Sequence, residues 1–479
     1  MKTATPFPEP QFPNPNDKIR RNTRRTKPPI ALLRPVRHSG FGFLSALVIG
    51  HSLFDRFTVA LFALLLAVSG SAWARELANY AADMREDLTE KTLPYWYDTT
   101  LDKTNGGYVL ADDVQGPRVA TEKQLVTQSR LIWTFSRVHL KGYSAETRNY
   151  LKAAEHGYRF LLDHFFDKKN GGYYWTTDLS GKVLNDRKIL YGESFVIYAL
   201  VEYYRASNDK EALRRAIDLY HDVQQHAHDP KNGGWFEHFT RDWTPIMKPD
   251  PEAIVEVAGY KSANTHLHLM EALTELYEVT LDDETKRSLE ESLRLNATYF
   301  YPREPGKSCF HRQPDWKEVT DPKSAGLSYG HNVEFAWLMI RAQKVQGTPL
   351  AWDHFYAHLN HAMKYGYDHE HGGLYSRGSD DQPATDTDKV WWVQAEMLAA
   401  LTDALQQKPN AEYEVAVKKL LDFVTNFMTD PSDGVWLDTV TADGKFKNTG
   451  KAHNWKANYH DVRAMLKFIE AFRPSLPKQ

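Results

Sequence analysis

The sequence predicts an all-α fold: an (α/α)6 barrel, in which six helical hairpins form a closed toroid with short β-hairpins at the connections. Two observations support this prediction. A glycine-centred turn with aromatic neighbours recurs along the chain, and a helical pattern lies on each side of every turn. Two helices per unit, in six units from about residue 75 onward, fit a ring that buries one large core.

The glycine turns mark five of the six units in chain order. They recur at intervals of about 62 to 65 residues, or about twice that across the fourth unit. In that unit the Pro- and Gly-bearing stretch 301–309 stands in place of the turn. The five turns are Asn105-Gly106-Gly107-Tyr108, Asn170-Gly171-Gly172-Tyr173, Asn232-Gly233-Gly234-Trp235, His371-Gly372-Gly373-Leu374-Tyr375 and Asp433-Gly434-Val435-Trp436.

The second helix of each unit, if it is the inner one, presents its start to a central cavity. These helices are predicted to begin near Gln124, Leu190, Gly259, Ser328, Val390 and Ala457. Polar groups interrupt their apolar pattern close to those starts. In order they are Arg130, Tyr191 with Glu193, Asn264 with His268, His331 with Glu334, Trp392 with Glu396, and Trp455 with His460.

One such group near a helix start is most often a cap or a partner of the helix dipole. Six consecutive helices with such groups at the same end instead predict one shared pocket. Within the third helix, Asn264 and His268 are four residues apart and share a face, whereas His266 points away from it.

Three histidines in one pocket fit two kinds of chemistry. A catalytic zinc site with three histidine ligands is one alternative. We expect no metal, because the three histidines come from different helices and the single Cys309 rules out a multi-cysteine site. The other alternative is proton transfer, since imidazole titrates near neutrality. Two imidazoles on opposite faces of a substrate carbon would remove a proton and return one, as an epimerase requires.

Three segments resemble motifs of the cellobiose 2-epimerases, a branch of the N-acylglucosamine 2-epimerase superfamily with the (α/α)6 barrel. They are residues 328–338 (SYGHNVEFAWL), 391–396 (WWVQAE) and 455–460 (WKANYH). The similarity extends over about residues 76–472. It implies reversible C2 epimerisation of the reducing-end glucose of a β-1,4-linked disaccharide, through a cis-enediolate and without a cofactor.

The resemblance also implies residue roles. His331 and His460 look like the catalytic acid/base pair, and His268 resembles the histidine that assists ring opening. The residues implied to bind substrate are Arg130, Asn264, Tyr191, Glu334, Trp392, Glu396 and Trp455. Departures from the family pattern, such as Asn332 and Asn458, flank the catalytic histidines and bear on substrate preference.

Other functions remain alternatives. An aldose-ketose isomerase of the same superfamily, acting on mannose or a related monosaccharide, would use the same proton abstraction. An (α/α)6 glycoside hydrolase would use Glu334 and Glu396 as its two carboxylates, but it leaves the three histidines unexplained. A sugar-binding protein would account for the 13 Trp, 25 Tyr and 23 Phe, but not for paired imidazoles.

The first 74 residues differ in composition from the rest. They hold ten Lys or Arg against three Asp or Glu, and an apolar run at 57–70 precedes Ala72-Trp73-Ala74. This pattern predicts a basic extension and signal peptide over 1–74, cleaved after Ala74, with an uncleaved N-terminal membrane anchor as the alternative. The barrel domain, 75–479, is then periplasmic or secreted. Its acidic balance excludes a basic nucleic-acid face. We expect a monomer that binds a small sugar and has no stable membrane association after cleavage.

Overall fold

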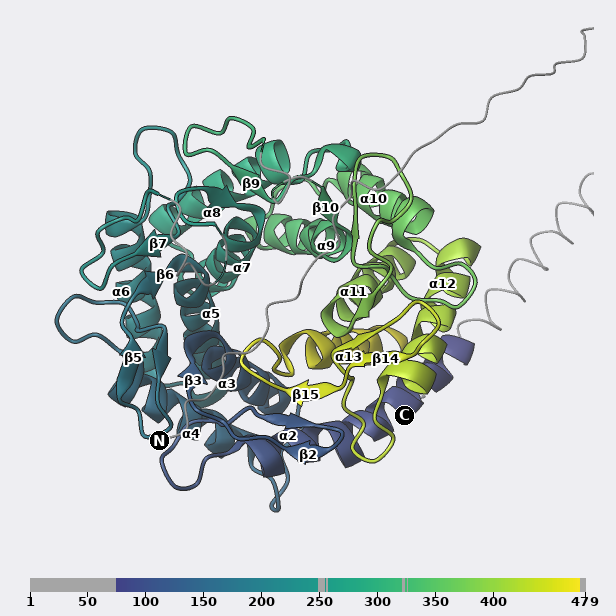
Figure 1. Ribbon diagram of the computed structural model, residues 1–479, viewed down its shortest axis with the longest axis horizontal. Helices are drawn as coiled ribbons and strands as arrows, with labels where there is room; N and C mark the ends of the chain where they lie inside the picture. Colours follow the sequence, from purple (N-terminus) through teal and green to yellow (C-terminus); the bar gives the residue numbers. More distant parts are fainter. Residues whose placement is uncertain (1–74, 249–254, 256, 321–323, 325, 474–479) are drawn as a thin grey trace, which may run out of the picture. The chain divides into compact units, whose positions relative to one another are not determined.

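The structure, a computed structural model, describes residues 75–248, 255, 257–320, 324 and 326–473. The predicted extension, signal peptide and domain boundary at residue 74 lie outside these residues. The described chain is mostly helical and forms two concentric rings of helices (Figure 1). Within these described segments, no helix combines the length and hydropathy that crossing a membrane requires.

The inner ring consists of the second helix of each unit. Consecutive inner helices pack against one another, and the last packs against the first, which closes the ring and confirms the predicted barrel (Figure 1). The six helices are α3 (Leu125–Leu140), α5 (Leu190–Ser207), α7 (Ala263–Thr280), α9 (Tyr329–Gln346), α11 (Trp391–Gln407) and α13 (Tyr459–Phe472).

The helix starts fall close to the predicted positions, with one larger difference. The third inner helix, α7, begins at Ala263 instead of near Gly259, because Lys261–Ser262 form strand β8. Ser262 then caps the helix: its side chain accepts a hydrogen bond of 3.1 Å from the Thr265 backbone N–H.

The outer ring encloses the inner one and shows a one-sided apolar pattern. In α6, for example, the buried residues Ala212, Ala216, Leu219 and Val223 recur every three or four positions and form one helix face. The inner helix α5, by contrast, is buried continuously over residues 190–203 because it packs on both sides. The outer helices are residues 75–87 with α2 (Leu93–Thr100), α4 (Tyr150–Phe160), α6 (Lys210–His226), α8 (Asp283–Leu295), α10 (Trp352–His361) and α12 (Ala411–Phe423).

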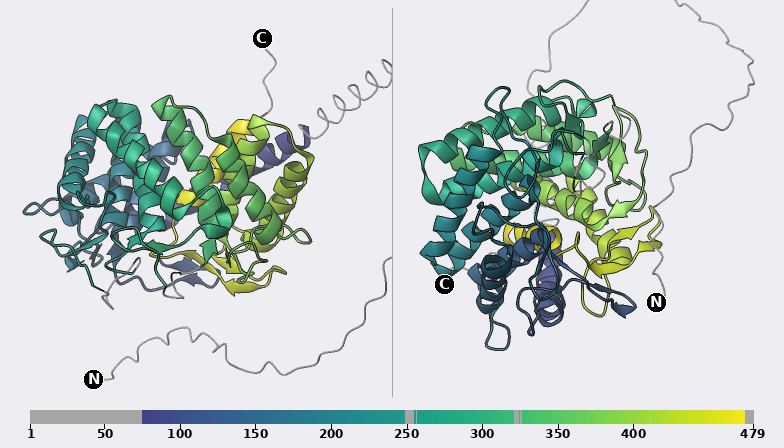
Figure 2. Two further views of the ribbon diagram at one scale, coloured as in Figure 1. Left: turned by 90° about the horizontal axis from the view of Figure 1, so that it is seen from above. Right: turned by 60° about the vertical axis from the view of Figure 1, so that its left-hand side comes forward.

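Short antiparallel strands join neighbouring units at one end of the helices (Figure 2). In each case, the strand that precedes an inner helix pairs with a strand of the next unit. The pairs are β3 (Lys123–Gln124) with β4 (Thr176–Thr177), β6 (Lys188–Ile189) with β7 (His238–Phe239), β8 with β9 (His311–Arg312), β10 (Leu327–Ser328) with β11 (Arg377–Gly378), β12 (Lys389–Val390) with β13 (Thr439–Val440), and β15 (Gly450–Ala452) with β1 (Asp112–Asp113). Three outer strands, β2 (Gly116–Pro117), β5 (Val183–Asn185) and β14 (Phe446–Asn448), extend β1, β4 and β13.

A buried lysine near the start of most inner helices pairs with an aspartate of the glycine turn in the same unit. The pairs are Lys123–Asp102, Lys261–Asp229 and Lys389–Asp368 at 2.8 Å, Lys188–Asp167 at 3.6 Å, and Lys451–Asp430 at 2.7 Å. The fourth unit has Leu327 at the lysine position and also lacks the glycine turn. The lysine and the glycine turn are therefore absent from the same unit, as expected of partners in one ion pair.

Candidate active site

A cavity of about 200 Å³ lies at the end of the ring where the inner helices begin. Its lining residues come from the first turns of the inner helices or from the segment just before α13. They are Arg130, Tyr191, Asn264, His268, His331, Trp391, Trp392, Trp455 and His460. Eight of the ten residues predicted from sequence thus lie together, whereas Glu334 and Glu396 are buried behind the wall. His266 turns away from the cavity and accepts a 3.2 Å hydrogen bond at Nε2 from the backbone N–H of Trp235.

His460 is held by a buried carboxylate. Its Nδ1 lies 2.6 Å from Glu396 Oε1, and the other oxygen of Glu396 accepts a 2.9 Å hydrogen bond from Trp337 Nε1. Because Nδ1 donates to the carboxylate, the lone pair of the neutral ring is at Nε2. Burial lowers the pKa of His460 to about 3, although the hydrogen bond to Glu396 opposes this shift.

His331 has different surroundings. Its ring centroid lies 4.7 Å from that of Trp392, which in turn lies 5.8 Å from the ring of His460. Among the described residues, Nδ1 of His331 has no hydrogen-bond partner. Burial lowers the pKa of His331 to about 3. Both candidate acid/base imidazoles are therefore neutral at neutral pH and close to the same tryptophan.

His268 and Arg130 lie on another part of the cavity wall. Nδ1 of His268 lies 3.0 Å from Glu271 Oε2, and burial lowers the pKa of this histidine. Arg130 donates a 2.9 Å hydrogen bond to the hydroxyl of Tyr191, and its guanidinium lies 4.4 Å from the ring centre of Phe195. Within the described chain, no carboxylate forms an ion pair with Arg130. A cation in this setting suits an oxyanion that develops on a bound substrate.

Behind the wall, the two predicted carboxyl groups differ in acidity. Burial, together with the negative charge of Glu396, raises the pKa of Glu334 well above its usual value. Burial also opposes ionisation of Glu396, but Arg463 and the hydrogen bond to His460 outweigh it and lower the pKa to about 2. Glu396 is therefore the stronger acid of the two and is ionised at neutral pH.

The same carboxylates bear on the question of a metal. Glu334, Glu396 and His460 each have one potential ligand atom within 4.8 Å of the others. Three such atoms could surround a cation. The guanidinium of Arg463 already donates to both carboxylates, at 3.0 and 2.7 Å. A metal ion there would compete with a fixed positive charge. A metal-free site remains our prediction.

Comparison with known proteins identifies the family. The model of the N-acylglucosamine 2-epimerase (GlcNAc 2-epimerase) family matches residues 106–464. The chain belongs to this family.

Three similar proteins are named for an epimerase or an isomerase activity. A cellobiose 2-epimerase of Dictyoglomus turgidum is 30% identical over 82% of this chain and 99% of its own length. The solved structure of a cellobiose 2-epimerase from Bacillus thermoamylovorans is 30% identical, with a TM-score of 0.74 over 82% of this chain and 99% of that one. A D-mannose isomerase of Marinomonas mediterranea is 25% identical over 80% of this chain and 95% of its own length.

Three residues of this epimerase-family site were not among the predicted site residues: Trp391, Glu271 and Arg463. A signal for each was present. Trp391 stands next to the predicted Trp392. Glu271 follows His268 by three residues on the same helix, a spacing that brings side chains together. Arg463 follows the buried Lys456 by seven residues, as His268 follows Lys261. On the other inner helices, the residues seven positions after the corresponding lysine, or after Leu327 in the fourth unit, are Arg130, Phe195, Glu334 and Glu396.

Proposed function

We propose that this chain catalyses reversible C2 epimerisation of the reducing-end glucose of β-1,4-linked disaccharides, such as cellobiose to glucosyl-mannose. The proposal rests on one observation above all: His331 and His460 are two buried, neutral imidazoles on one cavity that also holds the cation of Arg130. Relatives named cellobiose 2-epimerase, aligned over nearly their whole length, support it.

The residues account for each step of such a reaction. His268 assists opening of the hemiacetal, and the resulting aldehyde acidifies the proton at C2. One of the two histidines, His331 or His460, removes that proton as a general base. The cis-enediolate that forms is stabilised by Arg130. After rotation about C2–C3, the second histidine passes a proton from water to the opposite face of C2 and inverts the centre, and the first histidine releases its proton to water. The protons therefore balance, and no cofactor is required.

A second candidate is an aldose-ketose isomerase acting on free mannose. A relative named D-mannose isomerase is the observation in its favour. Such an enzyme would use the same base but return the proton to C1. The tryptophans at the cavity favour the disaccharide, because Trp392 and Trp455 offer aromatic faces to more than one sugar ring.

The deciding experiment is proton NMR of the purified, EDTA-treated protein with cellobiose in D2O. We expect a mannose-type anomeric signal and deuterium at C2. Conversion of mannose to fructose without any change in cellobiose would replace the proposal by the isomerase. Release of free glucose would instead indicate a hydrolase. Loss of turnover after EDTA, restored by a divalent metal, would contradict the metal-free site.

We further propose that the protein is exported and monomeric. The apolar run at 57–70 and Ala72-Trp73-Ala74 support cleavage after Ala74. Amino-terminal sequencing of protein recovered from the periplasm or medium should begin at Arg75. Recovery with the membrane fraction, with residues 1–74 still attached, would support the anchor. Light scattering of the purified protein should give the mass of one chain.

A further inference from the structure

We propose that Arg463 is a positioning residue that fixes His268 and His460 in their reactive orientation through two carboxylates, Glu271 and Glu396. This inference rests on the proposed function, because it assigns a role within that same site. Arg463 lies on α13, three residues after His460, and its side chain is 8% exposed. It does not line the cavity that holds the histidines.

The guanidinium of Arg463 contacts three carboxylates and one hydroxyl. It donates to Glu334 Oε1 at 3.0 Å and to Glu396 Oε1 at 2.7 Å through one nitrogen. Its other terminal nitrogen donates to Glu271 Oε1 and to the hydroxyl of Tyr459. These partners come from α7, α9, α11 and α13 itself. A planar guanidinium with several fixed donors can hold such an arrangement, whereas a lysine ammonium presents a single point charge.

Two of these carboxylates also hold a catalytic histidine. Glu271 uses separate oxygens, with Oε1 toward Arg463 and Oε2 toward Nδ1 of His268 at 3.0 Å. Glu396 Oε1 accepts from both Arg463 and Nδ1 of His460. Each histidine therefore has its Nδ1 fixed by a carboxylate that Arg463 orients. One cation sets the tautomer and the ring angle of two imidazoles on different helices.

Arg463 also contributes to the charges of this group. The charged or titratable groups around His460 are Glu396, Glu334, Arg463, Arg130, His331 and Tyr459. Arg463 lowers the pKa of His460 and His268, and it helps keep Glu271 and Glu396 ionised. Removing its charge would raise the pKa of all four groups. A histidine that must be neutral to act as a base would then become protonated at a higher pH than in the wild type.

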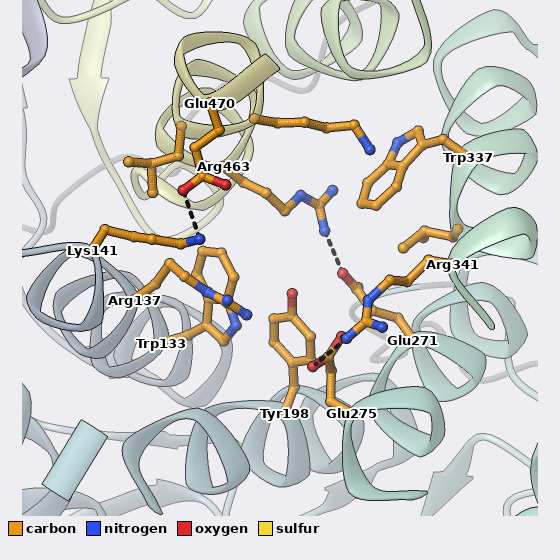
Figure 3. Close-up of a pocket in the computed structure, with 13 residues that line it drawn as sticks. Trp133, Arg137, Lys141, Tyr198, Glu271, Glu275, Trp337, Arg341, Arg463 and Glu470 are labelled. Atoms are coloured by element: carbon orange, nitrogen blue, oxygen red, sulfur yellow. Dashed lines mark hydrogen bonds and ion pairs between the residues drawn. The ribbon is translucent and has the colours of Figure 1, made fainter. Parts of the chain in front are cut away.

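Arg463 and Glu271 also line a second cavity, of about 260 Å³, toward the other ends of the inner helices (Figure 3). Arg341 lines this cavity too, and pairs at 3.1 Å with Glu275 and at 2.6 Å with Glu278. Neither of these carboxylates contacts a catalytic histidine. Arg341 is therefore a matched control: an arginine in the same cavity with two carboxylate partners but no link to the active site.

The test compares wild type with Arg463→Met, Arg463→Lys and Arg341→Met. We measure kcat, KM and the pH dependence of kcat/KM for cellobiose, after calorimetry has shown that each variant is folded. For Arg463→Met we expect kcat to fall by at least about 100-fold with KM within about threefold, because an orienting interaction is lost but no sugar contact. The acid limb of kcat/KM should move up by at least about one pH unit. Arg463→Lys should restore the acid limb but only part of kcat, and Arg341→Met should stay within about twofold of wild type.

Several outcomes would overturn the proposal. One is a folded Arg463→Met that keeps kcat within about threefold and an unmoved acid limb. Another is an equal loss in Arg341→Met. Should Arg463→Met not fold, Arg463→Lys decides by itself: a lowered kcat at unchanged KM supports the role, and wild-type kcat refutes it.

Failure of the proposed function would look different. A wild type that converts mannose to fructose, but not cellobiose, refutes the disaccharide reaction and leaves the same variants testable with mannose. If neither sugar reacts, nitrogen-15 histidine NMR of the wild type and Arg463→Lys decides. His268 and His460, assigned from His→Gln variants, should carry their proton at Nδ1 in the wild type and lose that preference in Arg463→Lys. Unchanged tautomers would refute the inference.

Discussion

Burial makes both candidate acid/base imidazoles neutral, but their hydrogen-bond partners make them unequal. His460 donates from Nδ1 to the ionised Glu396, whereas His331 packs against Trp392 without such a partner for Nδ1 among the described residues. A carboxylate partner stabilises the imidazolium that forms during catalysis. In the proposed reaction, His460 therefore has a hydrogen-bonded carboxylate that can stabilise its imidazolium, whereas His331 has none among the described residues.

Replacing either histidine should abolish turnover but not binding. We expect His331→Asn and His460→Asn each to lower kcat by about 10²- to 10⁴-fold, the usual contribution of a general acid or base. Calorimetric titration with cellobiose should show little change in affinity. His221→Asn, an exposed position on α6, is the control and should behave as wild type. Equal loss of binding and turnover would show that the imidazoles hold the sugar and do not transfer its proton.

The pH dependence of activity follows from the lowered histidine pKa values. A base must be neutral, and burial lowers the pKa of His331 and His460 from 6.5 to about 3. The neutral form therefore persists as the pH falls through 6.5. We expect kcat/KM for cellobiose to stay level between pH 7.5 and about 5.5. A decline centred at 6.5 would show that the imidazoles titrate as they do in water.

At the scale of single elements, each unit with a glycine turn is held by a buried lysine that joins this turn to its inner helix. In the third unit, Nζ of Lys261 donates to Asp229 and to the backbone carbonyls of Gly233 and Pro314. Pro314 lies in the next unit, so one ammonium joins the turn, the strand β8 and the neighbouring hairpin. Such a buried charge is favourable only while its partner is present.

Lys261→Met should destabilise the fold through the carboxylate that it leaves behind. We expect a loss of about 3 to 5 kcal/mol in the free energy of unfolding, and a clear recovery in the double variant Lys261→Met/Asp229→Leu. Thermal unfolding of the single and double variants measures both effects. Lys445→Met breaks a pair between largely exposed side chains and should lower the stability far less than Lys261→Met does. A double variant no more stable than Lys261→Met would argue against an uncompensated charge.

The segment between β15 and α13 presents Trp455 at the cavity. Trp455 is 39% exposed, and its ring lies 6.1 Å from the ring of Trp175. The neighbouring Asn454 donates a 2.6 Å hydrogen bond to Glu122 of the first unit. We expect Trp455→Ala to raise KM for cellobiose by about tenfold, because a stacking face is lost. Turnover of any monosaccharide should change far less. Equal effects on cellobiose and the monosaccharide would show that Trp455 does not stack on the second sugar ring.

The sequence predicted these elements well where a local pattern defines them. Glycine turns and helical periodicity located the helices, and the polar residues near the inner-helix starts located the cavity. The sequence did not show how far each side chain reaches. Arg130, His268, Glu334 and Glu396 all stand seven residues after the lysine position of their unit. Arg130 and His268 reach the cavity, whereas Glu334 and Glu396 stay behind its wall. Helical spacing gives the face of a residue, but packing against neighbouring helices decides its depth.

At the scale of the whole molecule, the ring holds neutral histidines in separate places. His331 and His460 lie at the cavity, while His358 lies on the outer helix α10, where burial lowers its pKa to about 3. The unfolded chain would bind protons at these positions from about pH 6.5 downward. Between about pH 6.5 and 3 the unfolded state therefore holds more protons, and stability is lost as the pH falls.

His358→Asn tests this contribution away from the active site. The substitution should lower the slope of unfolding free energy against pH by about 1.4 kcal/mol per pH unit between pH 6 and 4. Calorimetric unfolding at several pH values gives the slope, which is informative even if the variant is less stable at neutral pH. An unaltered slope in His358→Asn would contradict the lowered pKa of this imidazole in the folded state.

The pairing of β1 with β15 has a consequence for the chain as it is synthesised. Asp112–Asp113 find their partner strand only at Gly450–Ala452, more than three hundred residues later. Until residues 450–452 are synthesised, strand β1 of the first unit has one unpaired edge. Such an edge can pair with another copy of the chain. The last unit also supplies His460. Completion of the candidate active site and protection of the first strand therefore occur in the same late event. We expect a chain interrupted before residue 450 to be inactive and prone to aggregate.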